Sequence, residues 1–315
     1  MKRTAIPSVD LDLFRSSDPD KKMKFVQEIG AAYSDIGFVA IENHGIDQEL
    51  IKNLYKEIKN FFDLDINIKA KYENVEGGQR GYTSFGKEHA KDSNKGDLKE
   101  FWHFGQILEG NDPLRSEYPD NVMVEELPLF NKYGLESYRV FENTGKLILQ
   151  ALALYLSLDE HYFDQWVERG NSILRPIYYP PITQAPDGAV RAGAHEDINL
   201  ITLLVGASAD GLEVKDKEGN WLEAKAREDQ IVVNVGDMLQ RLSNDKLKST
   251  THRVVNPPKE KWATPRYSVP FFLHPQSAMP LNCLENCIDK DHPKRYEDIT
   301  AGDFLIQRLK EIGLL

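Results

Sequence analysis

A histidine and an aspartate two positions apart directly precede an apolar segment that is typical of a buried strand. The segment runs from Ile198 to Leu204, and His195 and Asp197 stand just before it. In an extended chain, residues i and i+2 point to the same side, so these two side chains could bind one metal ion. The pair alone is weak evidence, because a core histidine beside an exposed aspartate has the same spacing. A second imidazole, His252, opens another short strand pattern and strengthens the prediction.

Two imidazoles and one carboxylate on one face of an octahedron leave three coordination positions open. This is the ligand set of non-haem Fe(II) oxygenases, in which a co-substrate and dioxygen bind side by side. Zinc held by the same residues, as in hydrolases, is the competing interpretation. It gives no role to Arg266 and Ser268, a second i, i+2 pair that opens the apolar run to Leu273.

The Arg266 and Ser268 pair indicates a carboxylate-binding site. The planar guanidinium matches a carboxylate with two hydrogen bonds, and a hydroxyl on the same strand face can donate another. If the strands of His252 and Arg266 are neighbours, the guanidinium lies deeper in the same barrel. It could then bind the far carboxylate of a dicarboxylic acid whose near end chelates the metal. 2-Oxoglutarate has that shape. The alternative is that Arg266 forms a surface ion pair beside a solvated Ser268 and binds no ligand.

Composition excludes several partner classes. The 315 residues carry a formal charge of −11 and are 41% hydrophobic, which argues against nucleic acid or an anionic membrane as partner. We expect no membrane span, since no run of about 18 apolar residues is present, and no secretory signal precedes Pro7. Cys283 and Cys287 are expected to be free thiols in a reducing cytoplasm, with a disulfide as the alternative. No pattern indicates an oligomeric state.

Helical patterns dominate the first half of the chain and strand patterns the second. Helices are predicted over 19–35, after Asp47, over 135–158 and over 299–312, with a polar, glycine-rich loop over 76–97. Gly236 and Asp237 are interpreted as a tight turn. Short strands are predicted near 172–179, 189–194, 198–205, 211–215, 220–224, 230–235, 251–256 and 266–273. Eight short strands indicate a closed or double-sheet architecture of jelly-roll type.

The whole chain resembles the isopenicillin N synthase-like family of Fe(II)- and 2-oxoglutarate-dependent oxygenases. The resemblance rests on these stretches: Ile6–Leu11, Gly37-Phe38, Asn43–Ile46, Leu174-Arg175, Tyr178–Pro181, His195–Asp197, Asn234–Asp237, Lys248–Val254 and Arg266–Phe272. It implies a mainly β fold with flanking helices (α+β), built on a distorted double-stranded β-helix of the jelly-roll or cupin-like type. It also implies that His195, Asp197 and His252 bind iron and that Arg266 and Ser268 bind 2-oxoglutarate.

The same resemblance assigns further residues. By position, Tyr179 adds a hydroxyl to the 2-oxoglutarate site, and His44 is interpreted as structural. The expected substrate residues are Arg80, Tyr82, His103, Phe104, Gln240 and Phe272. Of these, Arg80 and His103 would suit an anionic substrate. At the position of Ile177, plant relatives typically carry Asn. The isoleucine of this chain therefore leaves the cofactor wall with one polar group fewer.

These observations predict an enzyme that uses Fe(II), 2-oxoglutarate and O2 to oxidise, by default to hydroxylate, an aliphatic C–H of a small molecule, yielding succinate and CO2. We expect one unit over 1–315, with a largely helical region at 1–165, the double-stranded β-helix at 166–275 and a helical extension at 276–315. Two alternatives stay open. An oxidase without 2-oxoglutarate would bind a substrate carboxylate at Arg266, and a receptor built on the same barrel would have no catalytic activity.

Overall fold

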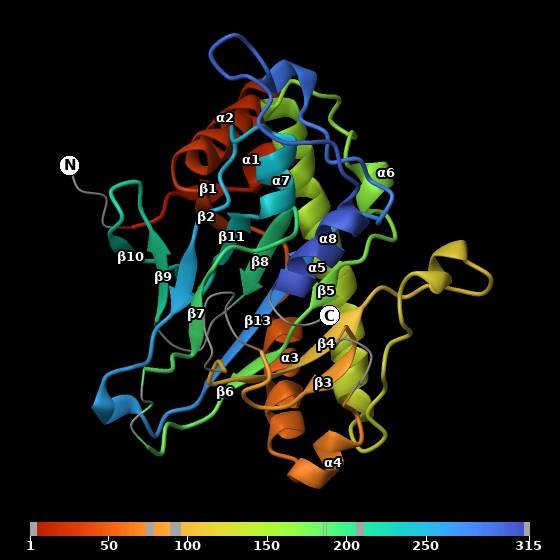
Figure 1. The fold of residues 1–315 in the computed structure, drawn as a ribbon, viewed down its shortest axis with the longest axis vertical. Coiled ribbons are helices and arrows are strands. Elements are labelled where there is room, and N and C mark those ends of the chain that lie inside the picture. The colour runs from red at the N-terminus through yellow and green to blue at the C-terminus, as the bar shows by residue number, and fades with distance from the viewer. Residues whose placement is uncertain are drawn as a thin grey trace.

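Two β-sheets face each other in the computed structural model, which describes residues 5–73, 79–88, 96–184, 186, 188–205 and 211–311. The larger sheet has the order β1 (Ser8–Asp10), β2 (Phe38–Glu42), β11 (Ile231–Val235), β8 (Ile201–Val205), β13 (Arg266–Leu273), β5 (Ile173–Leu174), β4 (Glu100–Gly105) and β3 (Gly81–Thr83), with β6 (Ile177–Tyr179) paired to β13 and β4. The smaller sheet has the order β10 (Trp221–Glu223), β9 (Leu212–Lys215), β12 (His252–Val254) and β7 (Ala192–His195) (Figure 1). The predicted jelly-roll fold with flanking helices is confirmed.

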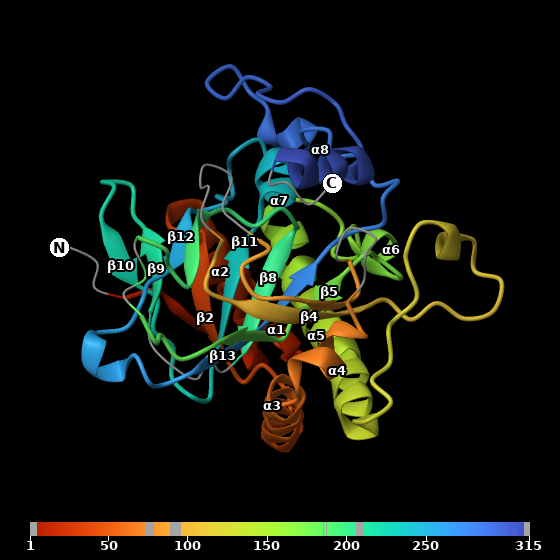
Figure 2. The same cartoon turned by 60° about the horizontal axis from the view of Figure 1, so that its bottom comes forward.

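Helices flank the sheets. They are α1 (Asp12–Arg15), α2 (Pro19–Asp35), α3 (Gln48–Phe62), α4 (Ile66–Ala70), α5 (Pro128–Tyr155), α6 (Asp164–Val167), α7 (Asp237–Leu242) and α8 (Ala301–Glu311), with 3-10 turns at Pro113–Ser116, Lys259–Lys261 and Glu285–Cys287. Figure 2 shows α3 and α5 together on one side of the sheets. In α5, Phe141 and Tyr138 bury their rings against Phe271 of β13. This packing fixes the strand that carries Arg266 and Ser268.

The helix starts follow local sequence signals. Asp18 accepts a hydrogen bond from the backbone N–H of Asp20 at 3.0 Å, and Pro19 occupies the first helical position of α2. Asp47 caps α3 in the same way, through the N–H of Glu49 at 2.9 Å. Both helices begin where the sequence predicts.

The space between the two sheets is apolar at one end. Phe38, Ala40 and Val232 of the larger sheet form a buried cluster with Val214 of the smaller sheet. Beyond Phe38 the space opens into a cavity. The jelly roll is therefore closed at one end by side-chain packing and is hollow at the other.

Three elements differ from the sequence prediction. Helix α5 begins seven residues earlier than predicted, at Pro128, because proline suits a first helical turn and Phe130 is buried. The strand predicted at 172–179 is divided into β5 and β6 at Pro176, which has no N–H to donate. Instead of a simple turn, Gly236 caps the short helix α7.

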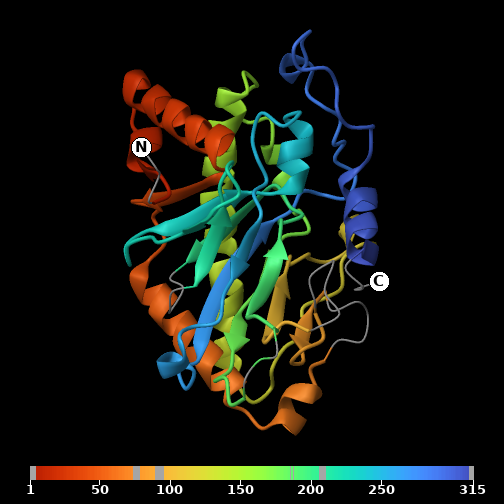
Figure 3. The same cartoon turned by 60° about the vertical axis from the view of Figure 1, so that its left-hand side comes forward.

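The carboxyl-terminal elements lie at the edge of the molecule away from α2, where Figure 3 shows α8. Cys283 and Cys287 are buried free thiols, as predicted. In the glycine-rich segment the structure adds β3, while 74–78 and 89–95 lie outside the described residues. None of the described helices is long and apolar enough to cross a bilayer.

Candidate functional site

The three predicted metal ligands meet on the smaller sheet. His195 at the end of β7 is the direct cross-strand partner of His252 at the start of β12, and their ring centroids are 4.4 Å apart. Asp197 Oδ1 lies 3.9 Å from His195 Nε2 and 3.7 Å from His252 Nε2. All three candidate ligand atoms lie within 4.8 Å of one another. Such a cluster can bind one metal ion with three protein ligands.

Backbone and side-chain contacts fix the orientation of each ligand. His195 Nδ1 donates to the carbonyl of Gly193 at 2.7 Å, and His252 Nδ1 donates to that of Thr250 at 3.1 Å. A carbonyl only accepts, so each Nε2 keeps its lone pair for a metal. Asp197 uses Oδ2 to accept hydrogen bonds from Thr202 Oγ1 at 2.6 Å and Asn234 Nδ2 at 2.8 Å. Its Oδ1 is left to face the two imidazoles.

The protonation states of His195 and Asp197 suit a divalent metal. Burial lowers the pKa of His195, and the neighbouring His252 lowers it further. Burial by itself would raise the pKa of Asp197, but the two imidazoles and the two hydrogen bonds lower it below its ordinary value. Neutral imidazoles and an ionised carboxylate are the donors that Fe(II) accepts. The residues therefore fit the predicted metal.

The predicted 2-oxoglutarate residues lie together on the larger sheet. Arg266 pairs with Tyr179 across β13 and β6, and its Cζ is 5.0 Å from the centroid of the Tyr179 ring. Ser268 follows on the same face, opposite Ile177. Arg266 and Ser268 are 1% and 4% exposed and line the cavity, so a carboxylate there would be shielded from water.

One geometric condition that the sequence left open is not met. The strands of His252 and Arg266 are not neighbours in one sheet, because β12 pairs with β7 and β9 while β13 pairs with β8, β5 and β6. The two residues belong to opposite sheets and meet across the cavity between them. Strand patterns do not reveal sheet membership, so the sequence could not distinguish these arrangements.

The cavity has a volume of about 780 Å³, and three rows of alternate side chains, along β4, along β5 and β6, and along β13, line it. The lining rows are Asp97, Lys99, Phe101 and His103 on β4 and the residues before it; Asn171, Ile173, Arg175, Ile177 and Tyr179 along β5 and β6; and Arg266, Ser268, Pro270, Phe272 and His274 along β13. Alternation along a strand explains these rows. Leu305, Arg308 and Leu309 of α8 add a further wall.

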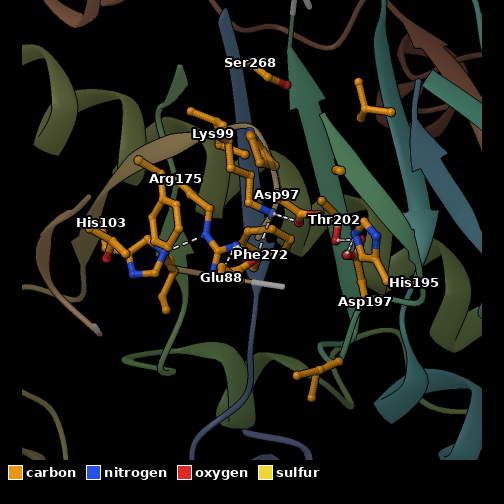
Figure 4. A pocket seen from close by; sticks show the side chains of 18 of the residues that line it. Glu88, Asp97, Lys99, His103, Arg175, His195, Asp197, Thr202, Ser268 and Phe272 are labelled. Atoms are coloured by element: carbon orange, nitrogen blue, oxygen red, sulfur yellow. Dashed lines mark hydrogen bonds and ion pairs between the residues drawn. The ribbon is translucent and has the colours of Figure 1, made fainter. Parts of the chain in front are cut away.

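A charged cluster in this lining was not predicted as part of the site (Figure 4). Lys99 Nζ lies 2.8 Å from carboxylate oxygens of both Glu88 and Asp97. Arg175 Nη1 lies 3.2 Å from Glu88, and Arg175 Nε donates to His103 Nε2 at 2.6 Å. Arg175 belongs to a row of alternate residues from Asn171 to Tyr179 that all line the cavity. This i, i+2 spacing could have identified Arg175, but Pro176 divides the strand and makes the alternation hard to recognise.

Two of the six expected substrate residues, His103 and Phe272, line the cavity. The other four are described residues outside that lining. Tyr82 is buried and donates to Glu100, and Phe104 packs on Trp102 and Phe130. Adjacent residues of a strand point to opposite faces, so His103 faces the cavity while Phe104 faces the helices.

Arg80 and Gln240 also have structural partners. The Arg80 side chain is fully buried, with Nη2 donating to Asn171 Oδ1 at 3.3 Å. Gln240 Oε1 accepts from the N–H of Ser249 at 2.7 Å. His44, interpreted as structural, is buried and accepts from the N–H of Ile46 through Nδ1 at 3.1 Å.

Family models match two parts of the chain. Residues 6–126 match the model described as the N-terminal region of non-haem dioxygenase in morphine synthesis, and residues 170–275 match that of the 2OG-Fe(II) oxygenase superfamily. The second match contains all three candidate metal ligands together with Arg266, Ser268 and Tyr179. The first contains β1 to β4 of the larger sheet.

Relatives match over nearly the whole length. The 2-oxoglutarate-Fe(II) type oxidoreductase hxnY of Emericella nidulans is 30% identical, covering 97% of this chain and 89% of its own. A 2OG-Fe(II) oxygenase family protein of Caulobacter crescentus is 43% identical with a TM-score of 0.90, covering 98% of this chain and 100% of its own. A full-length protein of Neurospora crassa, solved in complex with α-KG and thymine, is 30% identical with a TM-score of 0.85, covering 97% and 96%.

Proposed function

Because the chain belongs to the 2OG-Fe(II) oxygenase superfamily, we propose that His195, Asp197 and His252 bind its iron. We propose further that Arg266, Ser268 and Tyr179 bind 2-oxoglutarate, and that the enzyme oxidises an aliphatic C–H bond of a small molecule in the same cavity. Hydroxylation is the default outcome. The protein is thus an Fe(II)- and 2-oxoglutarate-dependent oxidoreductase.

One observation carries the assignment of roles. The three candidate ligand atoms lie within 4.8 Å of one another and line the same cavity as the buried guanidinium of Arg266. A zinc hydrolase would have no use for that guanidinium, whereas a dicarboxylate that chelates the metal at one end requires a cation at the other.

With both groups bound, iron and 2-oxoglutarate supply the oxidising chemistry, consuming O2 and yielding succinate and CO2. The chain itself supplies orientation and shielding from water. Thr202 and Asn234 hold the Asp197 carboxylate so that Oδ1 faces the imidazoles. Ser268 and Arg266 present donors to one carboxylate, and the Tyr179 ring under the guanidinium limits its movement.

The small-molecule substrate is supported by a solved relative. The Neurospora crassa protein has been crystallised with thymine and with 5-formyluracil. A cavity of about 780 Å³ has the size of a site for such a molecule together with 2-oxoglutarate.

Anaerobic titration tests the proposal. Adding 2-oxoglutarate to the Fe(II)-loaded protein should produce a charge-transfer absorbance band, and His252→Ala should abolish it. Exposure to O2 should then form succinate in the wild type. An Fe(II) protein that shows no band with 2-oxoglutarate, but consumes O2 with a carboxylic acid substrate, would support the oxidase alternative.

A further inference from the structure

The end of the cavity away from Arg266 has its own set of polar groups. Phe272 is the cross-strand partner of Thr202, the residue that holds Asp197, so the face of β13 from Phe272 onward lies beside the candidate metal centre. His274 and Asn171 continue the lining in this direction, and Arg175 faces it from the neighbouring row. If Arg266 binds 2-oxoglutarate, as proposed above, this end receives the substrate.

The charged side chains of the cavity wall are balanced within the protein. Of the two cations in the charged cluster, Arg175 is the one nearer this end, because Lys99 precedes Glu100, the cross-strand partner of Tyr178, and so lies on the side of Arg266. Lys99 and Arg175 are both paired with Glu88, and Lys99 is also paired with Asp97. The two cations and two carboxylates of this cluster sum to zero. Two further cations of the lining are also paired: Lys87 with Glu73 at 2.6 Å, and Arg308 with Asp237 at 3.3 Å. A substrate anion would have to compete with a carboxylate that is already bound.

The other polar groups at this end are uncharged. His274 is 7% exposed, and its Nδ1 is buried with no hydrogen-bond partner among the described residues. Burial lowers its pKa to about 4, so the imidazole is neutral near pH 7 and offers one donor and one acceptor. Asn171 adds an amide whose Oδ1 accepts from Arg80. In Arg175, Nε and Nη1 bind His103 and Glu88, while no described residue engages Nη2.

The space beside these groups favours a flat molecule. The guanidinium of Arg175 lies over two rings, with Cζ 4.5 Å from the centroid of Phe101 and 5.0 Å from that of Phe272. Phe272 is itself part of the cavity lining, as are Pro270 and Ile198. A planar ring can stack on such a surface while its edge reaches the polar groups.

We infer that this end of the cavity binds an uncharged, planar substrate with hydrogen-bonding groups at its edge, which Arg175, Asn171 and His274 recognise. This replaces the anionic substrate that the sequence suggested, because Arg80 lies outside the lining and His103 is an acceptor for Arg175. A carboxamide, lactam or cyclic imide has the required chemistry, and the corresponding carboxylic acids do not.

A matched pair of small probes tests the inference. Benzamide and benzoate have the same shape and differ in charge, and their binding to the anaerobic Fe(II)- and 2-oxoglutarate-loaded protein is measured by calorimetry. We expect benzamide to bind about tenfold more tightly than benzoate or better, and a tenfold ratio of dissociation constants corresponds to about 1.4 kcal/mol of binding free energy. Equal or tighter binding of benzoate, or no binding of benzamide at millimolar concentration, would overturn the inference.

A charge substitution tests the cause. Glu88→Gln removes the carboxylate shared by Lys99 and Arg175. It should shift the preference toward benzoate by about tenfold or more, because the two cations are then free to form charge-assisted hydrogen bonds with the benzoate carboxylate. Glu160→Gln is the matched control, since Glu160 pairs with Lys22 outside the cavity lining. An unchanged preference in Glu88→Gln would overturn the inference.

The two proposals fail in different ways. The Fe(II) and 2-oxoglutarate absorbance band reports the metal and cofactor sites alone. If that band is absent in the wild type, the proposed function fails. If the band is present in the wild type and in Glu88→Gln while the probe preferences are wrong, the substrate inference fails and the proposed function stands.

Discussion

His252 and His195 face each other as direct partners on β12 and β7, with ring centroids 4.4 Å apart. The ladder between these strands is irregular immediately after this pair, between His252 and Val254. A bulge of this kind changes the direction of a side chain, and such irregularities are common beside active sites. The position of His252 therefore depends on a local backbone feature as well as on strand pairing.

The hydrogen bonds to Asp197 should control metal affinity. Thr202→Val retains the shape of the side chain but removes the hydroxyl that donates to Asp197 Oδ2 at 2.6 Å. We expect Fe(II) affinity to fall roughly 10- to 100-fold, because residues that orient a metal ligand typically have effects of this size. Equilibrium dialysis with Fe(II) under nitrogen measures the change.

Thr264→Val is the matched control, since Thr264 is exposed and contacts Arg191 through its backbone carbonyl, which the substitution retains. If Thr202→Val binds Fe(II) as tightly as this control, the hydroxyl does not position the metal ligand.

The guanidinium of Arg266 should be irreplaceable by an ammonium group. Arg266→Lys keeps the charge but cannot form two parallel hydrogen bonds to a carboxylate or stack on Tyr179 in the same way. We expect the dissociation constant for 2-oxoglutarate to rise by about tenfold or more. Anaerobic titration of the absorbance band gives this constant, and Fe(II) affinity should be unchanged.

Arg253→Lys provides the comparison, because Arg253 pairs with Glu213 and does not line the cavity. Equal 2-oxoglutarate affinity in Arg266→Lys and the wild type would contradict the assignment of Arg266.

The sequence predicted the groups that follow from strand alternation. His195 with Asp197, and Arg266 with Ser268, are i, i+2 pairs, and the structure brings each pair to the cavity. Which sheet each strand joins depends on tertiary pairing, so the sequence left open where His252 lies relative to Arg266. The fold class was predictable because turn signals separate many short apolar segments.

The substrate end was harder to predict for a physical reason. In Phe101, Trp102, His103 and Phe104 both faces of the strand carry aromatic residues, so no polar alternation tells which side faces the cavity. Phe104 packs against helix α5, whereas His103 contacts Arg175. His274 follows the last residue of β13 and extends its alternation beyond the strand.

The close contact of Phe104 with α5 should govern stability. A Cβ at Gly134 would lie 2.2 Å from the Phe104 ring, and this ring is held among Trp102 and Phe130. Gly134→Ala gains about 1 kcal/mol of helix propensity but loses about 1–3 kcal/mol to overpacking, so we expect net destabilisation. Urea unfolding of the metal-free protein measures the difference, and a variant at least as stable as the wild type would contradict the packing argument.

The neutral imidazole of His274 should make stability depend on pH. Burial lowers its folded-state pKa from 6.5 to about 4, so between these values the unfolded chain binds the proton more tightly. The free energy of unfolding should therefore be fully retained above pH 6.5 and fall as the pH is lowered toward 4, by about 3 kcal/mol in total. His274→Leu should lack this component of the pH dependence, which urea unfolding of the metal-free protein at a series of pH values measures.

His161→Leu is the control, because His161 is exposed and its hydrogen bond to Asp164 raises its pKa. A wild type and a His274→Leu variant with parallel pH profiles would show that His274 is not held neutral by burial, and would remove one support for an uncharged substrate.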